Sequence, residues 1–126
     1  MEKPKINSFK DLRTWQKSIS FISEIYSLTG GFPSKEQFGL TSQLNRAAVS
    51  IACNIAEGWG RESKKSFIQF LRISRGSLFE VDTLLIIAVG QKYLDNNKYQ
   101  GFSEQIDEIG KMLNSFIISI EKKIDQ

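Results

Sequence analysis

Four polar side chains recur at spacings of three and four near the middle of the 126-residue chain: Arg46, Ser50, Asn54 and Glu57. At about 100° per residue, these spacings place them in one row on a helix, each within reach of the next. The row indicates a partly buried structural network, in which Glu57 pairs with an arginine and Asn54 bonds the backbone of a neighbouring helix. The alternative interpretation is a polar patch that contacts a ligand or a nucleic-acid backbone.

Basic side chains follow this row and continue into the next helical pattern, where Arg72 and Arg75 lie away from the apolar stripe. A nonspecific contact with phosphates needs only such charges, without a base-reading motif, and depends strongly on salt. The sequence therefore predicts a basic strip that binds RNA or DNA through phosphates. Its members are Arg61, Lys64, Lys65, Arg72 and Arg75.

The charge is unevenly distributed along the chain, although the formal net charge is only +3. Residues 35–75 contain seven basic and three acidic side chains, whereas residues 80–126 contain five basic and eight acidic ones. This asymmetry is compatible with an anionic partner on one side of the molecule. A solvated surface of mixed charge is the alternative, because the basic surplus is modest for a nucleic-acid binder.

Residue types that carry out most enzymatic chemistry are scarce. The chain has no histidine, which is the commonest general base and metal ligand, and Cys53 is its one cysteine. The sequence also lacks phosphate-binding glycine loops and the Gly-x-Ser-x-Gly turn of hydrolases. We therefore expect a non-enzymatic protein with no catalytic residues, no metal site and no cofactor. Cys53 lies among small residues and is expected to be a small buried hydrophobe.

The first half of the chain carries two helical patterns. The first is predicted to end before the breakers that begin at Gly30. The second is predicted to begin at Ser34, whose distance from Gln37 fits a capping box, and to end at Gly58 or Gly60. The apolar stripe of the first pattern consists of Leu12, Trp15, Ile19, Ile22 and Tyr26.

The second half predicts two further helices, one that starts near Ser63 and ends before Gly90 and one after Asp95-Asn96-Asn97. No segment alternates with the period of two that is typical of a strand. Length and composition fit a single domain over residues 1–126. Short connections between four long helices predict an all-α fold, an antiparallel up-down-up-down four-helix bundle.

Two surfaces indicate self-association. The segment Leu84–Val89 is apolar almost all round, which is hard to bury inside so small a domain. One face of the preceding helix carries mostly small side chains that let another helix approach closely. The sequence thus predicts an obligate homo-oligomer. The residues of the small face are Val49, Ala52, Cys53 and Ala56.

The sequence shows no membrane-spanning or export segment. Its longest apolar run, Leu84–Val89, is far below the roughly 20 residues that cross a bilayer. Residues 1–10 lack the apolar core of a signal peptide. We expect a cytoplasmic protein without a membrane partner.

Three stretches carry a resemblance to a known family: Phe9-x-x-Leu12-x-x-Trp15-Gln16-Lys17, then Phe38-Gly39-Leu40-Thr41-x-Gln43-Leu44-x-Arg46-Ala47-Ala48-x-Ser50-Ile51-x-x-Asn54-Ile55-Ala56-Glu57-Gly58-x-x-Arg61, and Gly76-Ser77-Leu78-x-Glu80. Together they resemble the 23S rRNA intervening-sequence proteins. The resemblance runs from Phe9 to about Tyr93, whereas the last predicted helix matches only in pattern. It implies a bacterial four-helix bundle that assembles as a ring-like homopentamer.

The resemblance extends to a related protein, the accessory variability factor of diversity-generating retroelements. That factor is a basic pentamer that binds nucleic acid and a reverse transcriptase, whereas this chain is only mildly basic. Two functions stay open on this ground. The first is a non-enzymatic oligomer that binds structured RNA through its phosphates. The second is a ring-shaped scaffold that binds a protein partner and no nucleic acid, with the basic residues forming salt bridges between subunits.

Overall fold

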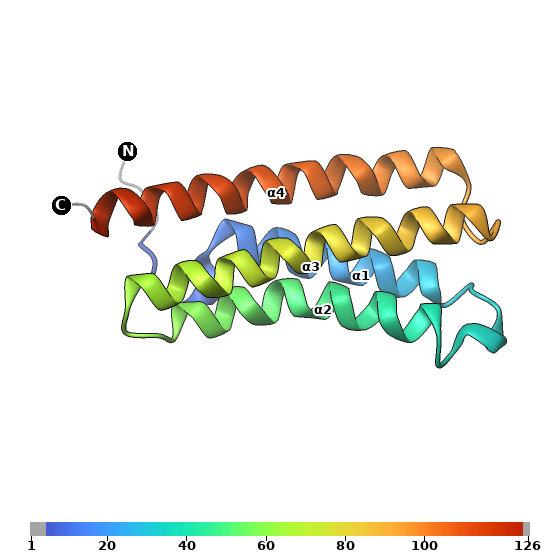
Figure 1. Ribbon diagram of the computed structural model, residues 1–126, viewed down its shortest axis with the longest axis horizontal. Coiled ribbons are helices and arrows are strands. Elements are labelled where there is room, and N and C mark those ends of the chain that lie inside the picture. The colour runs from blue at the N-terminus through green and yellow to red at the C-terminus, as the bar shows by residue number, and fades with distance from the viewer. Residues whose placement is uncertain (1–4, 125–126) are drawn as a thin grey trace.

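Four long helices make up most of the computed structural model, which describes residues 5–124. Both prolines of the sequence lie before residue 34, so no proline interrupts the later helices. The helices are α1 (Arg13–Thr29), α2 (Leu40–Trp59), α3 (Lys64–Gly90) and α4 (Asn96–Ile124), and the described part of the chain contains no strand. Consecutive helices run in opposite directions (Figure 1). The predicted all-α, antiparallel four-helix bundle is confirmed.

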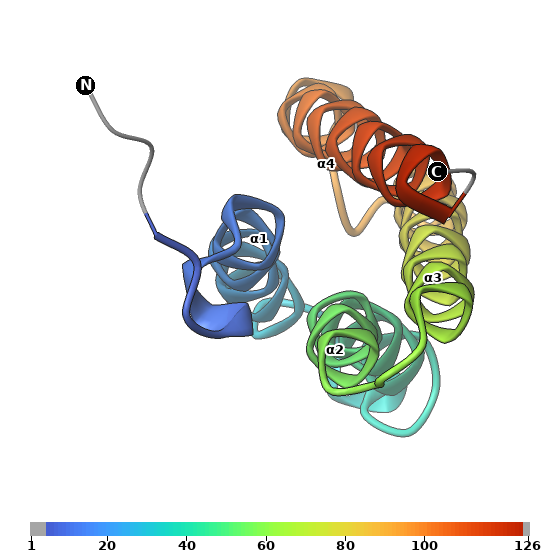
Figure 2. The same ribbon diagram turned by 90° about the vertical axis from the view of Figure 1, so that its left-hand side faces the viewer.

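The four helices are not packed equally around the bundle axis. The end-on view in Figure 2 shows α2 between α1 and α3, with α4 against the far side of α3. Among the helix pairs that are neighbours, α2 and α3 pack most extensively and α1 and α4 least. The bundle is therefore open along the side between its first and last helices.

The connection from α1 to α2 differs from its prediction. Ser34–Glu36 forms only a short 3-10 turn, and α2 begins at Leu40, so the predicted start at Ser34 is wrong. Gly39 interrupts the helical geometry with φ −110° and ψ −113°. Glu36 provides the cap instead, because its Oε1 accepts a hydrogen bond from the Leu40 amide at 3.2 Å.

A tyrosine from the α3–α4 connection holds the same carboxylate. The Tyr93 hydroxyl donates to Oε2 of Glu36 at 2.9 Å, and this hydrogen bond raises the pKa of Tyr93 above its ordinary value. Glu36 thus links the two connections at one end of the bundle. The start of α3 agrees with the sequence, since the Ser63 hydroxyl accepts from the Ser66 amide at 3.2 Å.

The buried face of α1 matches its prediction only in part, since Leu12 is buried and Trp15 and Ile22 pack against the core. Phe21 and Ile25 are fully buried, whereas Ile19 and Tyr26 of the predicted stripe are 40% and 49% exposed. Ser18 can share the core with Phe21 because its hydroxyl donates to the Thr14 carbonyl at 2.8 Å. Two apolar side chains, Ile19 and Tyr26, consequently remain on the outside of α1.

Small residues allow α2 and α3 to approach closely. Ser74 of α3 is fully buried, and its hydroxyl donates to the Ile51 carbonyl of α2 at 2.8 Å. At the end of α2, a Cβ on Gly58 would lie 2.7 Å from Cδ1 of Phe67 and 2.8 Å from Cβ of Phe70. Only glycine fits this contact without movement of α3.

None of the helices in the described part of the chain is long and apolar enough to cross a membrane.

The Gly58 contact predicts a packing effect on stability. Gly58→Ala should lower the free energy of unfolding by about 1–3 kcal/mol, because the Cβ of Phe70 cannot rotate away from the new methyl group. Denaturant titration measures the difference. Gly60→Ala is the matched control, since its Cβ would meet nothing closer than 3.5 Å. Equal stabilities of the two variants would contradict the close contact.

Candidate nucleic-acid interface

Three segments bring basic residues to one end of the bundle. The end of α2, the start of α3 and the end of α4 lie at the same end of the molecule, as Figure 1 shows. Arg61 lies in the α2–α3 connection, Lys64 and Lys65 begin α3, and Lys122 and Lys123 lie in the last turn of α4. We call these five residues the basic end.

The lysines of α4 are absent from the site predicted from sequence. Their place at the site could have been predicted from the topology, because an antiparallel bundle places the end of its fourth helix beside the start of its third. The acidic residues of the same three segments are Glu57, Glu62 and Glu121. The basic end therefore keeps a positive surplus.

Arg61 is the most constrained cation of the basic end. Its Nη2 lies 2.9 Å from Oε1 of Glu57, and its guanidinium carbon lies 4.8 Å from the centre of the Phe70 ring. The side chains of Glu57 and Arg61 are 58% and 49% exposed. The arginine partner predicted for Glu57 is present, but the pair is on the surface rather than partly buried.

Lys64 and Lys65 are both exposed, and neither forms an ion pair within 4.0 Å with a described residue. Exposed, unpaired ammonium groups can exchange solvent counterions for phosphate oxygens without first breaking a protein contact. These two lysines are thus the best placed of the predicted strip to contact an anion.

Arg72 and Arg75 lie farther along α3, where both contact α4. Nη2 of Arg72 lies 4.0 Å from Oε1 of Glu121, and Nη1 of Arg75 donates to Oδ1 of Asn114 at 2.7 Å. At 1.5 Å per residue, Arg75 begins about 15 Å from Lys65 along the helix axis. The structure brings Arg61, Lys64 and Lys65 together but turns Arg75 toward the α3–α4 seam.

The predicted polar row divides into two parts. Nδ2 of Asn54 donates to the carbonyl and the hydroxyl oxygen of Ser50, both at 2.8 Å, and the Ser50 hydroxyl lies 2.8 Å from that of Ser77 on α3. Asn54 therefore bonds its own helix, not the backbone of a neighbour as predicted. Arg46 is exposed and has no part in these bonds, because its side chain extends into solvent one turn before Ser50.

Cys53 is exposed, so its prediction as a buried residue is wrong for the single chain. Ile51 and Ala52 take the buried positions of this turn, which leaves Cys53 on the outer side of α2. No group of three or more His, Cys, Asp or Glu residues that could hold a metal ion occurs among residues 5–124.

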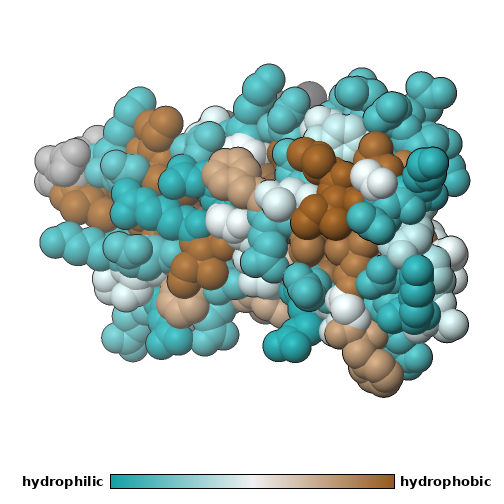
Figure 3. All heavy atoms as spheres, turned by 45° about the vertical axis from the view of Figure 1, so that its right-hand side comes forward, coloured by the Kyte–Doolittle hydropathy of each residue, from teal (hydrophilic) through white to brown (hydrophobic). Residues whose placement is uncertain are grey.

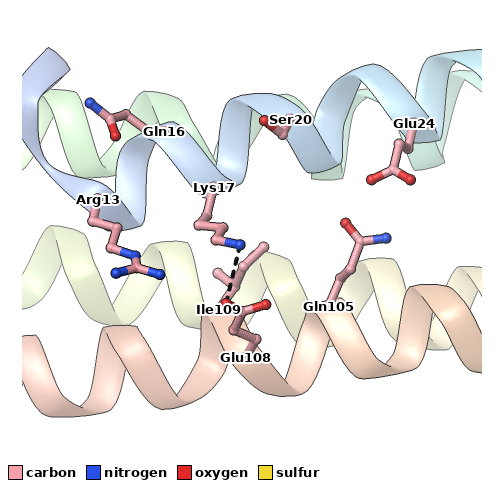
Figure 4. Close-up of a pocket in the computed structure, with 8 residues that line it drawn as sticks. All are labelled: Arg13, Gln16, Lys17, Ser20, Glu24, Gln105, Glu108 and Ile109. Carbon is pink, nitrogen blue, oxygen red and sulfur yellow. Dashed lines mark ion pairs between the residues drawn. The ribbon is translucent and has the colours of Figure 1, made fainter.

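A groove lies along the open side between α1 and α4. Its volume is about 740 Å³, and an ion pair of 3.2 Å between Lys17 and Glu108 crosses it (Figure 4). Arg13 and Glu24 add one further charge of each sign. Because cations and anions alternate here, the groove does not concentrate the positive charge that a phosphate needs.

Comparison with known proteins identifies the relatives of this chain. A model of the family described as 23S rRNA-intervening sequence protein matches residues 10–115. The chain belongs to this family. A solved structure of a protein of unknown function, from the S23 ribosomal protein family of Bacteroides thetaiotaomicron, is similar to it with a TM-score of 0.76 and 27% sequence identity. The similarity covers 82% of this chain and 97% of the other. No curated protein matches the chain.

The exposure of the Glu57–Arg61 pair predicts a small contribution to stability. Glu57→Ala should lower the free energy of unfolding by no more than about 0.5 kcal/mol, since solvent screens an exposed pair four residues apart on a helix. Denaturant titration beside Glu62→Ala, a neighbouring exposed carboxylate without an ion pair, provides the comparison. A loss above about 2 kcal/mol for Glu57→Ala alone would indicate a buried network instead.

Proposed function

We propose that this protein is a non-enzymatic cytoplasmic RNA-binding module that acts as a homo-oligomer and contacts phosphates through its basic end. The observation that carries the proposal is the convergence of five cations from three segments, with Lys64 and Lys65 unpaired. The family name refers to intervening sequences of 23S rRNA, which favours RNA over DNA as the ligand.

The charge of one subunit sets the strength of binding. Five cations that face three carboxylates in the same segments give a modest positive potential. Binding to one subunit should therefore be weak and fall steeply with salt. Several copies in one assembly would raise the apparent affinity through simultaneous contacts with a single RNA.

Exposed apolar side chains support the oligomer. Figure 3 shows apolar side chains gathered on one face of the molecule. On α3, Ile86 is 54% and Ile87 45% exposed, while their neighbours Leu84 and Leu85 are buried within the chain. Soluble monomers rarely expose large apolar patches without a partner. Ile73 and Phe79 extend the exposed apolar face of α3 toward the basic end.

A second apolar surface lies on the other side of α2, where α1 exposes Ile19 and Tyr26. Figure 2 shows α1 and α3 on opposite sides of α2. Two different surfaces that join head to tail generate a ring when the rotation between copies closes. We therefore propose that α3 of one copy packs on the α1–α2 side of the next, and the family resemblance favours five copies.

A ring-shaped protein-interaction scaffold is the second candidate, and the loop residue Phe38 favours it. Phe38 is 90% exposed at the end of the bundle opposite the basic end, where it is available to a protein partner. In a scaffold, Arg61 and Arg72 would form salt bridges between subunits. Within one chain, each of them already forms an ion pair with a glutamate.

Phosphate contacts predict a specific change in salt dependence. Lys64→Gln combined with Lys65→Gln should reduce the slope of log K against log salt by up to about 0.7 for each lost contact with single-stranded RNA. The effect should be the same for RNAs of different sequence. Fluorescence polarisation of labelled RNA between low and moderate salt measures the slope.

The matched control is Lys98→Gln combined with Lys111→Gln, which removes two exposed lysines of α4 outside the basic end. This control should retain the wild-type slope. If the two double variants change the slope equally, the basic end is not the contact surface. If wild-type protein binds no RNA at low salt, the scaffold is the better function.

A further inference from the structure

A cleft opens at the basic end with the character of a ligand site. It encloses about 390 Å³, within the range of small-molecule pockets in proteins. Three aromatic rings and three aliphatic side chains contribute to its wall, and two lysines supply the charge. The rings are Trp59, Phe67 and Phe116, the aliphatic residues are Ile6, Leu12 and Ile120, and the cations are Lys64 and Lys123.

The aromatic wall is held by edge-to-face packing. The ring centre of Phe67 lies 6.3 Å from that of Trp59 at an interplanar angle of 87°, and 5.2 Å from that of Phe116 at 78°. All three rings pack against the core but are only partly buried. Flat apolar surface is therefore available to a ligand without rearrangement of the core.

The two lysines come from different helices. Lys64 lies in the first turn of α3 and Lys123 in the last turn of α4, and both are exposed. No described carboxylate lies within 4.0 Å of either ammonium group. An anionic group at the mouth of the cleft would thus meet two cations that form no ion pair with a carboxylate of residues 5–124.

Aromatic rings next to cations suit a ligand that combines a flat ring with a negative charge. Nucleotides have this combination, and stacking of a base on an aromatic side chain tolerates any base because each has a π-face. A base within a duplex is already stacked and paired, so only an unpaired nucleotide can enter. A purely aliphatic ligand would leave both lysines without a partner.

We propose that this cleft binds one unpaired nucleotide, with its base against Trp59 and Phe67 and its phosphate between Lys64 and Lys123. The inference rests on the proposed RNA binding and adds to it a preference for single-stranded segments or ends. A free mononucleotide presents the same chemistry as a nucleotide of a strand, so the experiment distinguishes these two sources.

Intrinsic fluorescence reports directly on the cleft. The chain has two tryptophans, and Trp15→Phe leaves Trp59 as the only one. Oligouridylate should quench this emission in a saturable manner, whereas an abasic ribose-phosphate strand of the same length should not. Lys64→Gln combined with Lys123→Gln should raise the half-saturating concentration about tenfold. Lys98→Gln combined with Lys111→Gln, in the same background, should leave it unchanged.

A second probe separates free nucleotides from strands. Quenching by uridine monophosphate at the nucleotide concentration of the strand indicates a site for free nucleotides, and quenching by the strand alone indicates a site for RNA. Both results support the cleft. Polarisation of labelled oligouridylate, measured on the same samples, reports total binding independently of Trp59.

Three results would overturn the inference. If polarisation shows binding while the emission of Trp59 stays constant, the RNA contacts the basic end outside the cleft and only the proposed function stands. If laurate quenches Trp59 and uridylate does not, the cleft takes an aliphatic anion. If neither signal responds at low salt, both this inference and the proposed RNA binding fail.

Discussion

The close packing of α2 against α3 is the constraint on which the rest of the structure depends. Ser74 bonds the α2 backbone from within the core, and Gly58 leaves room for the ring of Phe67 and the Cβ of Phe70. This contact fixes the short connection that carries Arg61 and begins α3 at Lys64. It also places Phe67 between Trp59 and Phe116. The basic end and the aromatic cleft both follow from how near these two helices lie.

Sequence patterns predict the helices well where burial and capping act locally. The end of α2 and the Ser63 cap of α3 are examples, because each depends on residues within one turn. The start of α2 is different, since its cap is a glutamate oriented by a tyrosine more than fifty positions later. The buried face of α1 is not predicted by apolar spacing alone, because a polar residue, Ser18, enters the core with its hydroxyl bonded to its own helix. Lys122 and Lys123 join the candidate site only through the topology.

A single chain does not bury all of its large apolar side chains. Apolar spacing gives each helix a core-facing stripe, but α1 and α3 both retain apolar residues outside it, of which Ile19 and Ile86 are examples. The cations of the basic end lie at one end of the bundle, away from the charged groove between α1 and α4. An assembly through the sides of α1 and α3 would therefore cover apolar surface while the basic ends stay free. In this account, self-association and RNA binding use different parts of one bundle.

The central claim is that an assembly, not a single chain, holds the RNA. Sedimentation velocity of a fluorescently labelled RNA with micromolar protein at low salt tests it most directly, because one measurement reports binding and mass. The account predicts that the RNA sediments with a protein mass several times the 14.3 kDa of one chain. RNA that sediments freely, or with the mass of a single chain, would contradict it.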